Sequence, residues 1–295
     1  MPEYVGGAAI PILSRYDIEL DSSSILGRGG MGVVFRARDR LMDRMVAIKT
    51  INPSLVDLAG VRESIEHRLF FREAMTHARL GILHPAQILP VTNYGIEDDT
   101  PFMEMDILEG GSLRDRMNKQ RDRKRRGPFF DEEKLKLICG QLCDALKVLH
   151  NNKVYHSDLK PENILFASKG YDQLKVADLG LARVARSGLL TRAGLNTFAG
   201  GTMHYTPQEV TEGLKKATER TDLYSFGVIL FELITREPLR WSQATSKFVE
   251  GHADLSPAAK DIIKRSCQLM GRNNFKSADD LQEKLAANNL LGPAR

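Results

Sequence analysis

The spacing of apolar residues changes along the first hundred residues of the chain. Five short apolar runs with turn signals between them predict β-strands: residues 18–26, 33–38, 45–51, 88–94 and 102–108. The segment from Val61 to Leu80 instead has helical spacing, with Ile65, Leu69 and Met75 toward one side. The pattern predicts a first lobe built from a sheet and one helix.

The rest of the chain has mostly helical spacing. After Asp131, a suitable N-cap, apolar residues recur every three or four positions: Leu135, Ile138, Leu142, Leu146 and Leu149. Segment 223–234 is apolar almost all round, which predicts a buried helix. Two further helices are predicted at 257–269 and 278–287. Runs at 163–166 and 174–177 flank a polar turn and predict a small hairpin.

The connection between the two lobes is predicted at residues 106–111, where Gly110 and Gly111 allow the chain to bend. This divides the chain into four parts: a flexible tail at 1–14, an N-terminal lobe at 15–105, a hinge and C-terminal lobe at 106–290, and a tail at 291–295.

Composition narrows the class of protein. The 295 residues are 42% hydrophobic and 27% charged, which allows a packed core, and a net charge of +4 gives no reason to expect nucleic acid as a partner. No apolar run approaches the roughly 20 residues needed to span a bilayer, and the N-terminus lacks a secretory signal pattern. We therefore expect a cytoplasmic protein without a membrane segment in this chain.

The chain contains three cysteines, an odd and sparse count that indicates free thiols in a reducing compartment. Cys139 and Cys143 are four residues apart and would share a helix face. A metal or redox role is one interpretation, but a pair facing the core is favoured, because no second pair of ligands stands at metal-binding spacing near them.

The first candidate for chemistry is the glycine-rich turn Gly27-Arg28-Gly29-Gly30-Met31-Gly32. Glycines let backbone N–H groups approach phosphates closely, although an ordinary tight hairpin has the same pattern. A dinucleotide-binding turn is disfavoured, because a strand and not a helix follows the glycines.

The second candidate is Lys49, which stands in an apolar strand. Burying its charge costs free energy unless a partner of opposite charge binds it, and Glu73 is a suitable partner. A lysine at a sheet edge is the alternative.

The densest signal is the segment 155–165, in which Asp158, Lys160 and Asn163 place a base, a cation and a metal ligand in one loop. Asp178 follows in Ala177-Asp178-Leu179-Gly180, between an apolar strand and a glycine. Oxygen ligands from Asn163 and Asp178, together with bound phosphates, are a typical magnesium arrangement.

In order and spacing these segments resemble the eukaryotic-type (Hanks-type) protein kinase family, and most of all the bacterial Ser/Thr kinases. The resemblance covers roughly residues 16–285 and includes Gly-Gly-Met-Gly at 29–32, Phe-Arg-Glu-Ala at 71–74 and Glu-Gly-Gly-Ser-Leu at 109–113. It implies an α+β bilobal kinase fold, with a small, mainly β N-lobe and a larger, mainly α C-lobe. It also implies transfer of phosphate from ATP, with Mg²⁺, to Ser or Thr of protein substrates, and autophosphorylation.

The resemblance assigns roles residue by residue. Asp158 would accept the substrate hydroxyl proton, Lys160 would steady the γ-phosphate, and Lys49, held by Glu73, would contact the α- and β-phosphates. Asn163 and Asp178 would hold Mg²⁺. The remaining assignments concern the nucleotide and the loop: Gly27, Gly29, Gly30 and Gly32 at the phosphates; Val34, Ala47 and Leu165 around adenine; Met105 as gatekeeper; the backbone of Asp106 and Leu108 at the adenine edge; Ser112 near the ribose; Thr202 near Asp158; and Asp222 supporting the catalytic loop from below.

The chain departs from the family pattern at several positions. Ser157 replaces the arginine that usually precedes the catalytic Asp and meets activation-loop phosphate. Phe275 stands where an arginine usually pairs with the glutamate at Glu209, which leaves Arg272 as a candidate partner. His77 falls where an apolar residue is usual and puts tight packing of that helix in question. The basic run 121–126 is interpreted as a solvated loop, with docking of acidic partners as the alternative.

Two other functions remain open at this stage. A pseudokinase scaffold would bind nucleotide and partners without efficient catalysis, but its usual signature, the loss of the lysine or of a catalytic or metal-binding Asp, is absent from this sequence. A small-molecule kinase is disfavoured by segment 201–209, which resembles the part that shapes a peptide groove. The sequence does not decide between a monomer and a dimer, or identify the protein substrate.

Overall fold

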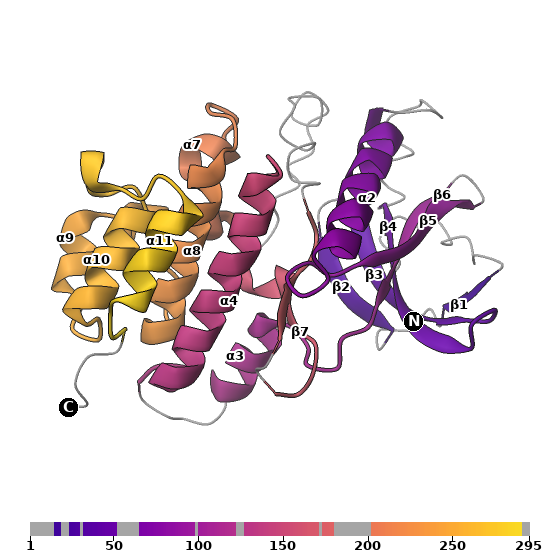
Figure 1. Cartoon of the computed structure of the whole chain (residues 1–295), viewed down its shortest axis with the longest axis horizontal. Helices are drawn as coiled ribbons and strands as arrows, with labels where there is room; N and C mark the ends of the chain where they lie inside the picture. The colour runs from indigo at the N-terminus through magenta and orange to yellow at the C-terminus, as the bar shows by residue number, and fades with distance from the viewer. Residues whose placement is uncertain are drawn as a thin grey trace. The chain divides into compact units, whose positions relative to one another are not determined.

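The computed structural model describes residues 15–18, 24–29, 32–51, 65–97, 100–121, 127–170, 173–179 and 202–290 (Figure 1). These residues fall into two compact units. The first contains the described residues between 15 and 85 together with Leu89–Ile107. The second contains Ala86–Ile88 and the described residues from 108 to 290.

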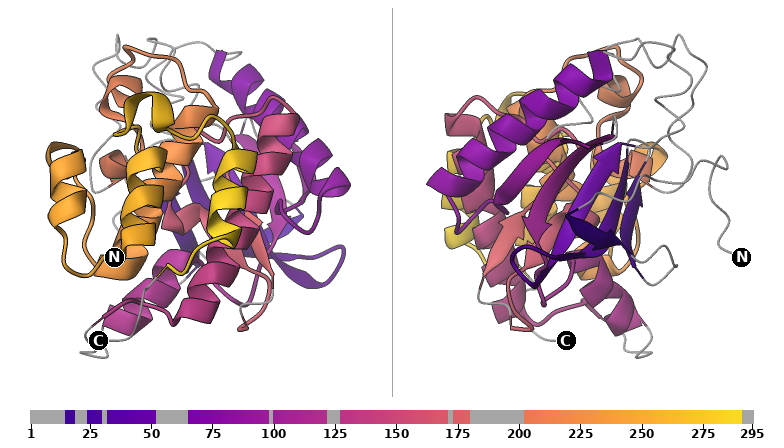
Figure 2. Two further views of the ribbon diagram at one scale, coloured as in Figure 1. Left: turned by 60° about the vertical axis from the view of Figure 1, so that its left-hand side comes forward. Right: turned by 90° about the vertical axis from the view of Figure 1, so that its right-hand side faces the viewer.

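The first unit is built on a sheet of six antiparallel strands: β1 (Tyr16–Ile18), β2 (Ile25–Gly29), β3 (Gly32–Asp39), β4 (Arg44–Ile51), β5 (Val91–Glu97) and β6 (Thr100–Asp106). The strands lie in the order β1-β3-β4-β6-β5, and β2 also pairs with β3. The helix α2 (Ile65–Leu83) packs against β5 and β6, as the right-hand view of Figure 2 shows.

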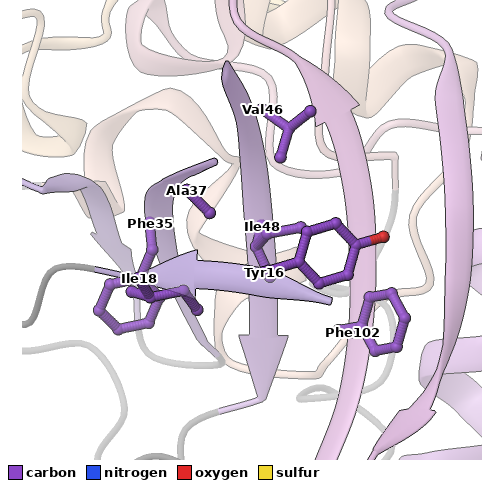
Figure 3. Packing of buried hydrophobic residues seen from close by; sticks show 7 residues of the cluster. All are labelled: Tyr16, Ile18, Phe35, Ala37, Val46, Ile48 and Phe102. Atoms are coloured by element: carbon purple, nitrogen blue, oxygen red, sulfur yellow. The ribbon is translucent and has the colours of Figure 1, made fainter. Parts of the chain in front are cut away.

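Alternation along the strands gives the sheet two different faces. One face carries a cluster of buried side chains: Tyr16, Ile18, Phe35, Ala37, Val46, Ile48 and Phe102 (Figure 3). Val34 pairs with Lys49, and Ala47 pairs with Met105, so these four residues share the opposite face. The candidate nucleotide residues of this unit are therefore separated from its hydrophobic cluster by the thickness of the sheet.

Several predicted strand boundaries differ from the structure. The run 18–26 contains the end of β1 and the start of β2, with a bend at Ser24. Ile88 forms only an isolated bridge with Val176, and β5 begins at Val91. Strand β6 ends at Asp106, two residues earlier than expected. Continuous apolar runs predict where strands lie, but hydrogen-bond partners decide where they end.

The helix α2 was predicted with Met75 on its apolar side, and this is wrong. Met75 is 59% exposed, whereas Ala74, His77 and Leu80 are fully buried. Because each residue turns a helix by about 100°, the face through Ala74, His77 and Leu80 leaves Met75 outside it. His77 is 1% exposed, so the polar side chain is accommodated in the packed side of the helix. The side chains of Ile65 and Leu69 lie outside the described residues.

The second unit is mainly helical. Its longer helices are α3 (Leu113–Arg121), α4 (Glu132–Asn151), α8 (Glu219–Thr235), α10 (Pro257–Ser266) and α11 (Ala278–Ala286), and its shorter ones are α7 (Gln208–Thr211) and α9 (Ser246–Gly251). Within the described part of this unit, 3-10 turns accompany them: η1 (Pro161–Asn163), η2 (Thr202–Tyr205), η3 (Trp241–Gln243) and η4 (Gly271–Asn273). The predicted hairpin is present as β7 (Ile164–Phe166) and β8 (Leu174–Val176).

The two central helices form where the pattern predicts them. Asp131 caps α4 by accepting a hydrogen bond from the backbone N–H of Lys134 at 2.9 Å. All five apolar residues predicted for its inner face are buried. Helix α8 starts with a capping box between Thr218 and Thr221 and is buried on all sides over Thr221–Ile234. Helix α8 packs against α4 and α10 and forms the centre of the unit.

The cysteine prediction is confirmed, since Cys139, Cys143 and Cys267 are free thiols buried in the core. Burial raises the pKa of the Cys143 thiol to about 12 and the pKa of the other two thiols even further. The three thiols are therefore protonated and unreactive at neutral pH.

The residues that depart from the family pattern are accommodated in different ways. Phe275 is fully buried, and the guanidinium of Arg265 lies 4.1 Å from the centre of its ring. Glu209 pairs with Lys215 at 3.3 Å on the surface, so the expected pairing with Arg272 is wrong. Among the described residues, no helix is both long and apolar enough to cross a membrane.

Candidate active site

The loop after α4 brings three predicted site residues of the second unit together. The Lys160 ammonium donates to the Asp158 carboxylate at 2.8 Å. The side-chain amide of Asn163, in η1, donates to the Asp158 carbonyl at 2.9 Å. The Asn163 carbonyl accepts a hydrogen bond from the backbone N–H of Ala177 at 3.0 Å, which places Asp178 directly beside this loop. A carboxylate, an ammonium and a side-chain amide therefore lie within one small region, next to a second carboxylate.

Asp222 holds this loop from beneath, as the sequence predicted. Its carboxylate is fully buried in α8 and accepts hydrogen bonds from the backbone N–H groups of His156, at 2.9 Å, and Ser157, at 2.8 Å. His150, at the end of α4, contacts the same carboxylate through its Nε2 at 2.9 Å. A second imidazole, that of His156, lies 3.0 Å from the carbonyl of Ala177 and so connects the loop to the segment before Asp178.

Two residues of the candidate site have unusual backbone conformations. Ser157 has a φ of 67° and Asp178 a φ of 66°, which is the left-handed region that residues with a side chain rarely adopt. Such conformations persist only where the surroundings enforce them, and they gather at functional sites. For Ser157, the bond from its N–H to Asp222 supplies that enforcement.

The chain segment 110–112 is attached directly to β7. Gly110 donates to the carbonyl of Phe166 at 3.1 Å, and Phe166 donates back to Gly111 at 3.0 Å. Ser112 and Leu165 pair in an isolated bridge, so these two predicted nucleotide-binding residues lie side by side. The Ser112 hydroxyl donates to the Asp115 carboxylate at 2.7 Å and accepts from the Asp115 backbone N–H at 3.0 Å, and the second bond caps the start of α3.

Gly110 allows this attachment, and we expect Gly110→Ala to destabilise the second unit by about 1–3 kcal/mol. A Cβ at residue 110 would lie 2.1 Å from the Ser168 carbonyl oxygen and 2.4 Å from that of Phe166, so backbone would have to move. Urea unfolding can be followed through Trp241, the single tryptophan of the chain.

Gly140→Ala is the matched control. Gly140 lies inside α4, and an added Cβ there meets no atom within 4 Å. Since alanine favours a helix over glycine, this variant should gain about 0.5–1 kcal/mol. Equal stability of the two variants would show that the attachment of 110–112 to β7 is not tight.

The candidate residues of the first unit lie on its sheet. Lys49 is 6% exposed in β4, a strand paired with β3 on one side and β6 on the other, which excludes the sheet-edge interpretation. Val34, Ala47 and Met105 share its face. Among the glycines, Gly27 and Gly29 belong to β2, and Gly32 pairs with Gly29 across the turn. Gly30 lies outside the described residues, as do the side chains of Glu73, in α2, and of Thr202, in η2.

A charged cluster in the second unit was not predicted. Glu232, only 2% exposed in the buried helix α8, accepts hydrogen bonds from Arg114 at 2.8 Å and from Arg121 at 2.9 Å. The hydroxyl of Tyr205, three residues after Thr202, also donates to Glu232, and Arg114 reaches Glu162 at 2.8 Å. The cluster joins α3 and α8 to the turn that contains Thr202. The signal in the sequence was a glutamate inside an otherwise apolar helix.

Arg121 also corrects the interpretation of the basic run. It was expected to begin a solvated loop, but it ends α3 and bonds to a buried carboxylate. Residues 122–126 lie outside the described part of the chain.

Comparison with known proteins identifies the family. A family model described as "Protein kinase domain" matches residues 20–287. The chain is 33% identical over 250 residues to the serine/threonine-protein kinase PrkC of Bacillus subtilis, covering 84% of this chain and 35% of PrkC. It is 32% identical over 270 residues to the serine/threonine-protein kinase PknD of Mycobacterium tuberculosis, covering 87% of this chain and 38% of PknD. The chain thus spans little more than a third of the length of either relative.

Solved structures show the same fold. A mutant form of the kinase domain of Mycobacterium tuberculosis PknI superposes with a TM-score of 0.66 at 19% identity, covering 95% of this chain and 98% of that one. A structure of Rad53 1-466 in complex with AMP-PNP superposes with a TM-score of 0.65 at 19% identity, covering 92% of this chain and 64% of that one. The expected kinase fold, with a mainly β lobe and a mainly helical lobe, is confirmed.

Proposed function

Because the chain belongs to the protein kinase family, we propose that it transfers the γ-phosphoryl group of ATP to Ser or Thr hydroxyls of proteins, including its own chain. The observation that carries this proposal is the cluster of Asp158, Lys160 and Asn163, with Asp178 beside it. Its relatives PrkC and PknD are serine/threonine-protein kinases, which supports this choice of acceptor. The predicted division into an N-lobe at 15–105 and a hinge with C-lobe at 106–290 is part of the proposal.

The residues of the loop fit a magnesium ion. Asn163 and Asp178 offer an amide oxygen and carboxylate oxygens, the hard donors that Mg²⁺ prefers, and such sites usually need only one or two protein ligands beside phosphate oxygens. The Asn163 amide nitrogen is committed to the Asp158 carbonyl, so its oxygen is the atom suited to a metal. When bound, Mg²⁺ would neutralise charge on the phosphates.

In the proposed reaction, Asp158 orients the substrate hydroxyl and accepts its proton while the hydroxyl oxygen bonds to the γ-phosphorus. The bond between the γ-phosphorus and the β,γ-bridging oxygen breaks, and ADP leaves with the electron pair. Lys160, 2.8 Å from Asp158, holds the carboxylate in place and offers a cation to the transferred group. Most of the catalytic effect of these residues is positioning and charge stabilisation.

Residues of the first unit would bind the nucleotide. Lys49 has its charge buried in the sheet, where a phosphate can use it, and Val34, Ala47 and Met105 give the same face an apolar surface for adenine. The structure of Rad53 in complex with AMP-PNP supports a nucleotide as the ligand, while the individual residues belong to the proposal. In the second unit, Leu165 and Ser112 would contact adenine and ribose, and Leu108 would offer its backbone.

Mixing the protein with ATP labelled on the γ-phosphate and a generic protein substrate tests the proposal. We expect Mg²⁺-dependent labelling on Ser and Thr, found by mass spectrometry on the substrate and on the chain itself, and its loss when the metal is chelated. Labelling mainly on Tyr would contradict the choice of acceptor. ATP binding without transfer under any condition would instead favour the pseudokinase scaffold.

A further inference from the structure

A buried carboxylate lies in the hydrophobic face of the first unit. Glu104, in β6, is 1% exposed, and its register partner is Ile48, a member of the hydrophobic cluster. A carboxylate in such a place is costly unless its oxygens are fully bonded. One oxygen accepts from the Tyr16 hydroxyl at 2.5 Å, and the other accepts from the Thr92 hydroxyl at 2.8 Å.

Tyr16 is itself fixed in this cluster. Its ring lies edge-on to that of Phe102, with 5.6 Å between the ring centres (Figure 3). Asn93 donates to its hydroxyl at 2.9 Å. Burial and the bond to Glu104 raise the pKa of Tyr16, so the hydroxyl keeps its proton and remains the donor. The carboxylate of Glu104 therefore has a fixed position in the sheet.

Arg44, the first residue of β4, connects this fixed carboxylate to a second one. One nitrogen of its guanidinium donates to Glu104, and the other donates to Asp106 at 2.6 Å. The planar fork of an arginine can hold two carboxylates at once, which a single ammonium group cannot do with the same geometry. Arg44 is 35% exposed and Asp106 is 48% exposed, whereas Glu104 is buried. The exposed end of β6 is thus tied to an anchor inside the unit.

The two carboxylates held by Arg44 stand on either side of Met105, a residue assigned to the nucleotide site. Met105 stands between Glu104 and Asp106 and points to the opposite face of the sheet, where it pairs with Ala47. Asp106 is the last residue of β6, the point at which the strand's regular hydrogen bonds end. Asp106 forms the last register pair of β6, with Val46, so the fork adds a side-chain support at the end of the ladder.

We propose that Arg44 is a positioning residue for adenine recognition: by holding Asp106 against buried Glu104, it fixes the backbone that bonds the adenine edge. This inference rests on the proposed binding of ATP and adds a residue that lies on the face of the sheet turned away from the nucleotide. It predicts that affinity for ATP depends on a side chain that never touches it.

The test uses two variants. Arg44→Lys keeps the positive charge but loses the planar fork, and Asp106→Asn weakens only the bond between Arg44 and residue 106. Arg38→Lys is the matched control, because Arg38, in β3 of the same sheet, makes an arginine–aspartate pair with Asp43 in the turn before β4, with both side chains more than half exposed. Calorimetry gives the dissociation constant for ATP, steady-state kinetics give KM and kcat, and circular dichroism verifies folding.

Both Arg44→Lys and Asp106→Asn should raise the dissociation constant and the KM for ATP about tenfold. The reason is that each variant loses about one charge-assisted hydrogen bond that holds the adenine-binding backbone in position. The kcat at saturating ATP should stay near that of the parent, since Asp158 and Lys160 are unchanged. A merely structural role would lower the melting temperature without this split between KM and kcat. ATP affinities equal to that of Arg38→Lys would overturn the inference, while a parent that does not bind ATP would overturn the proposed function itself.

Discussion

Replacing Asp158 by asparagine should lower kcat for phosphoryl transfer about 10²- to 10⁴-fold, the range that general-base catalysis contributes. Asparagine has nearly the same size and can still accept a hydrogen bond from Lys160, but it cannot take the proton of the substrate hydroxyl. The Asp158 side chain is 28% exposed, so its replacement leaves no buried group without a partner. Affinity for ATP and the urea midpoint should therefore remain close to those of the parent.

Asp261→Asn provides a control of the same chemistry. Asp261 also pairs with a lysine, Lys284, at 2.8 Å, and both side chains are about one-third exposed. Since this pair lies on α10 and α11, away from the catalytic loop in sequence and in its contacts, its loss should leave kcat unchanged. A parent-like kcat for Asp158→Asn, or an equal loss in both variants, would exclude Asp158 as the base.

The sequence predicted the helical core because burial there follows simple periodicity. In α4, residues at steps of three and four fall on one face, and all five of the predicted inner residues are buried. In α8, the apolar run has no polar face to turn toward solvent, so the helix is expected at the centre of the unit, where it is found. Neither prediction needed knowledge of neighbouring elements, since the sequence of each helix indicates its own buried side.

The predictions failed where a neighbouring element decides the outcome. In α2, Gly81 lets the helix approach Pro90, since a Cβ at Gly81 would lie 2.6 Å from Pro90 Cα, and this contact sets which face is buried. Met75 is apolar but lies off that face. The short helix α3 shows little periodicity, because only Leu113 and Met117 are apolar on its inner side and the third buried residue there is Arg116.

The candidate site shows the same division. Asp158, Lys160 and Asn163 were predictable because they belong to one contiguous loop, and their resemblance to a known family is local in sequence. Glu232 and Arg44 were not, since each acquires its role from residues far along the chain: Arg114 for Glu232, and Asp106 for Arg44. When a charged residue is paired with a partner far along the chain, a single sequence gives only a weak signal of it: a polar residue within an apolar stretch.

Asp222→Ala should destabilise the second unit by about 3–5 kcal/mol, because it removes one buried carboxylate that serves three donors. The backbone N–H groups of His156 and Ser157 and the imidazole of His150 would lose their acceptor in a dry environment. Urea unfolding can be followed through Trp241, whose indole N–H donates to Thr206 at 2.8 Å, while the Thr206 hydroxyl donates to Ser157.

Activity should fall further than the loss of folded protein explains. Ser157 keeps its left-handed backbone because Asp222 holds its N–H, and release of that residue would let Asp158, the next in the chain, leave its position. Ser225→Ala, one turn along the same buried helix, removes only a hydroxyl bonded to Thr221 and should cost less than about 1 kcal/mol. At a temperature where both variants are fully folded, we expect Ser225→Ala to retain the parent's kcat and Asp222→Ala to lose most of it. Equal kcat values for the two folded variants would mean that Asp222 supports the stability of the unit but does not position the catalytic loop.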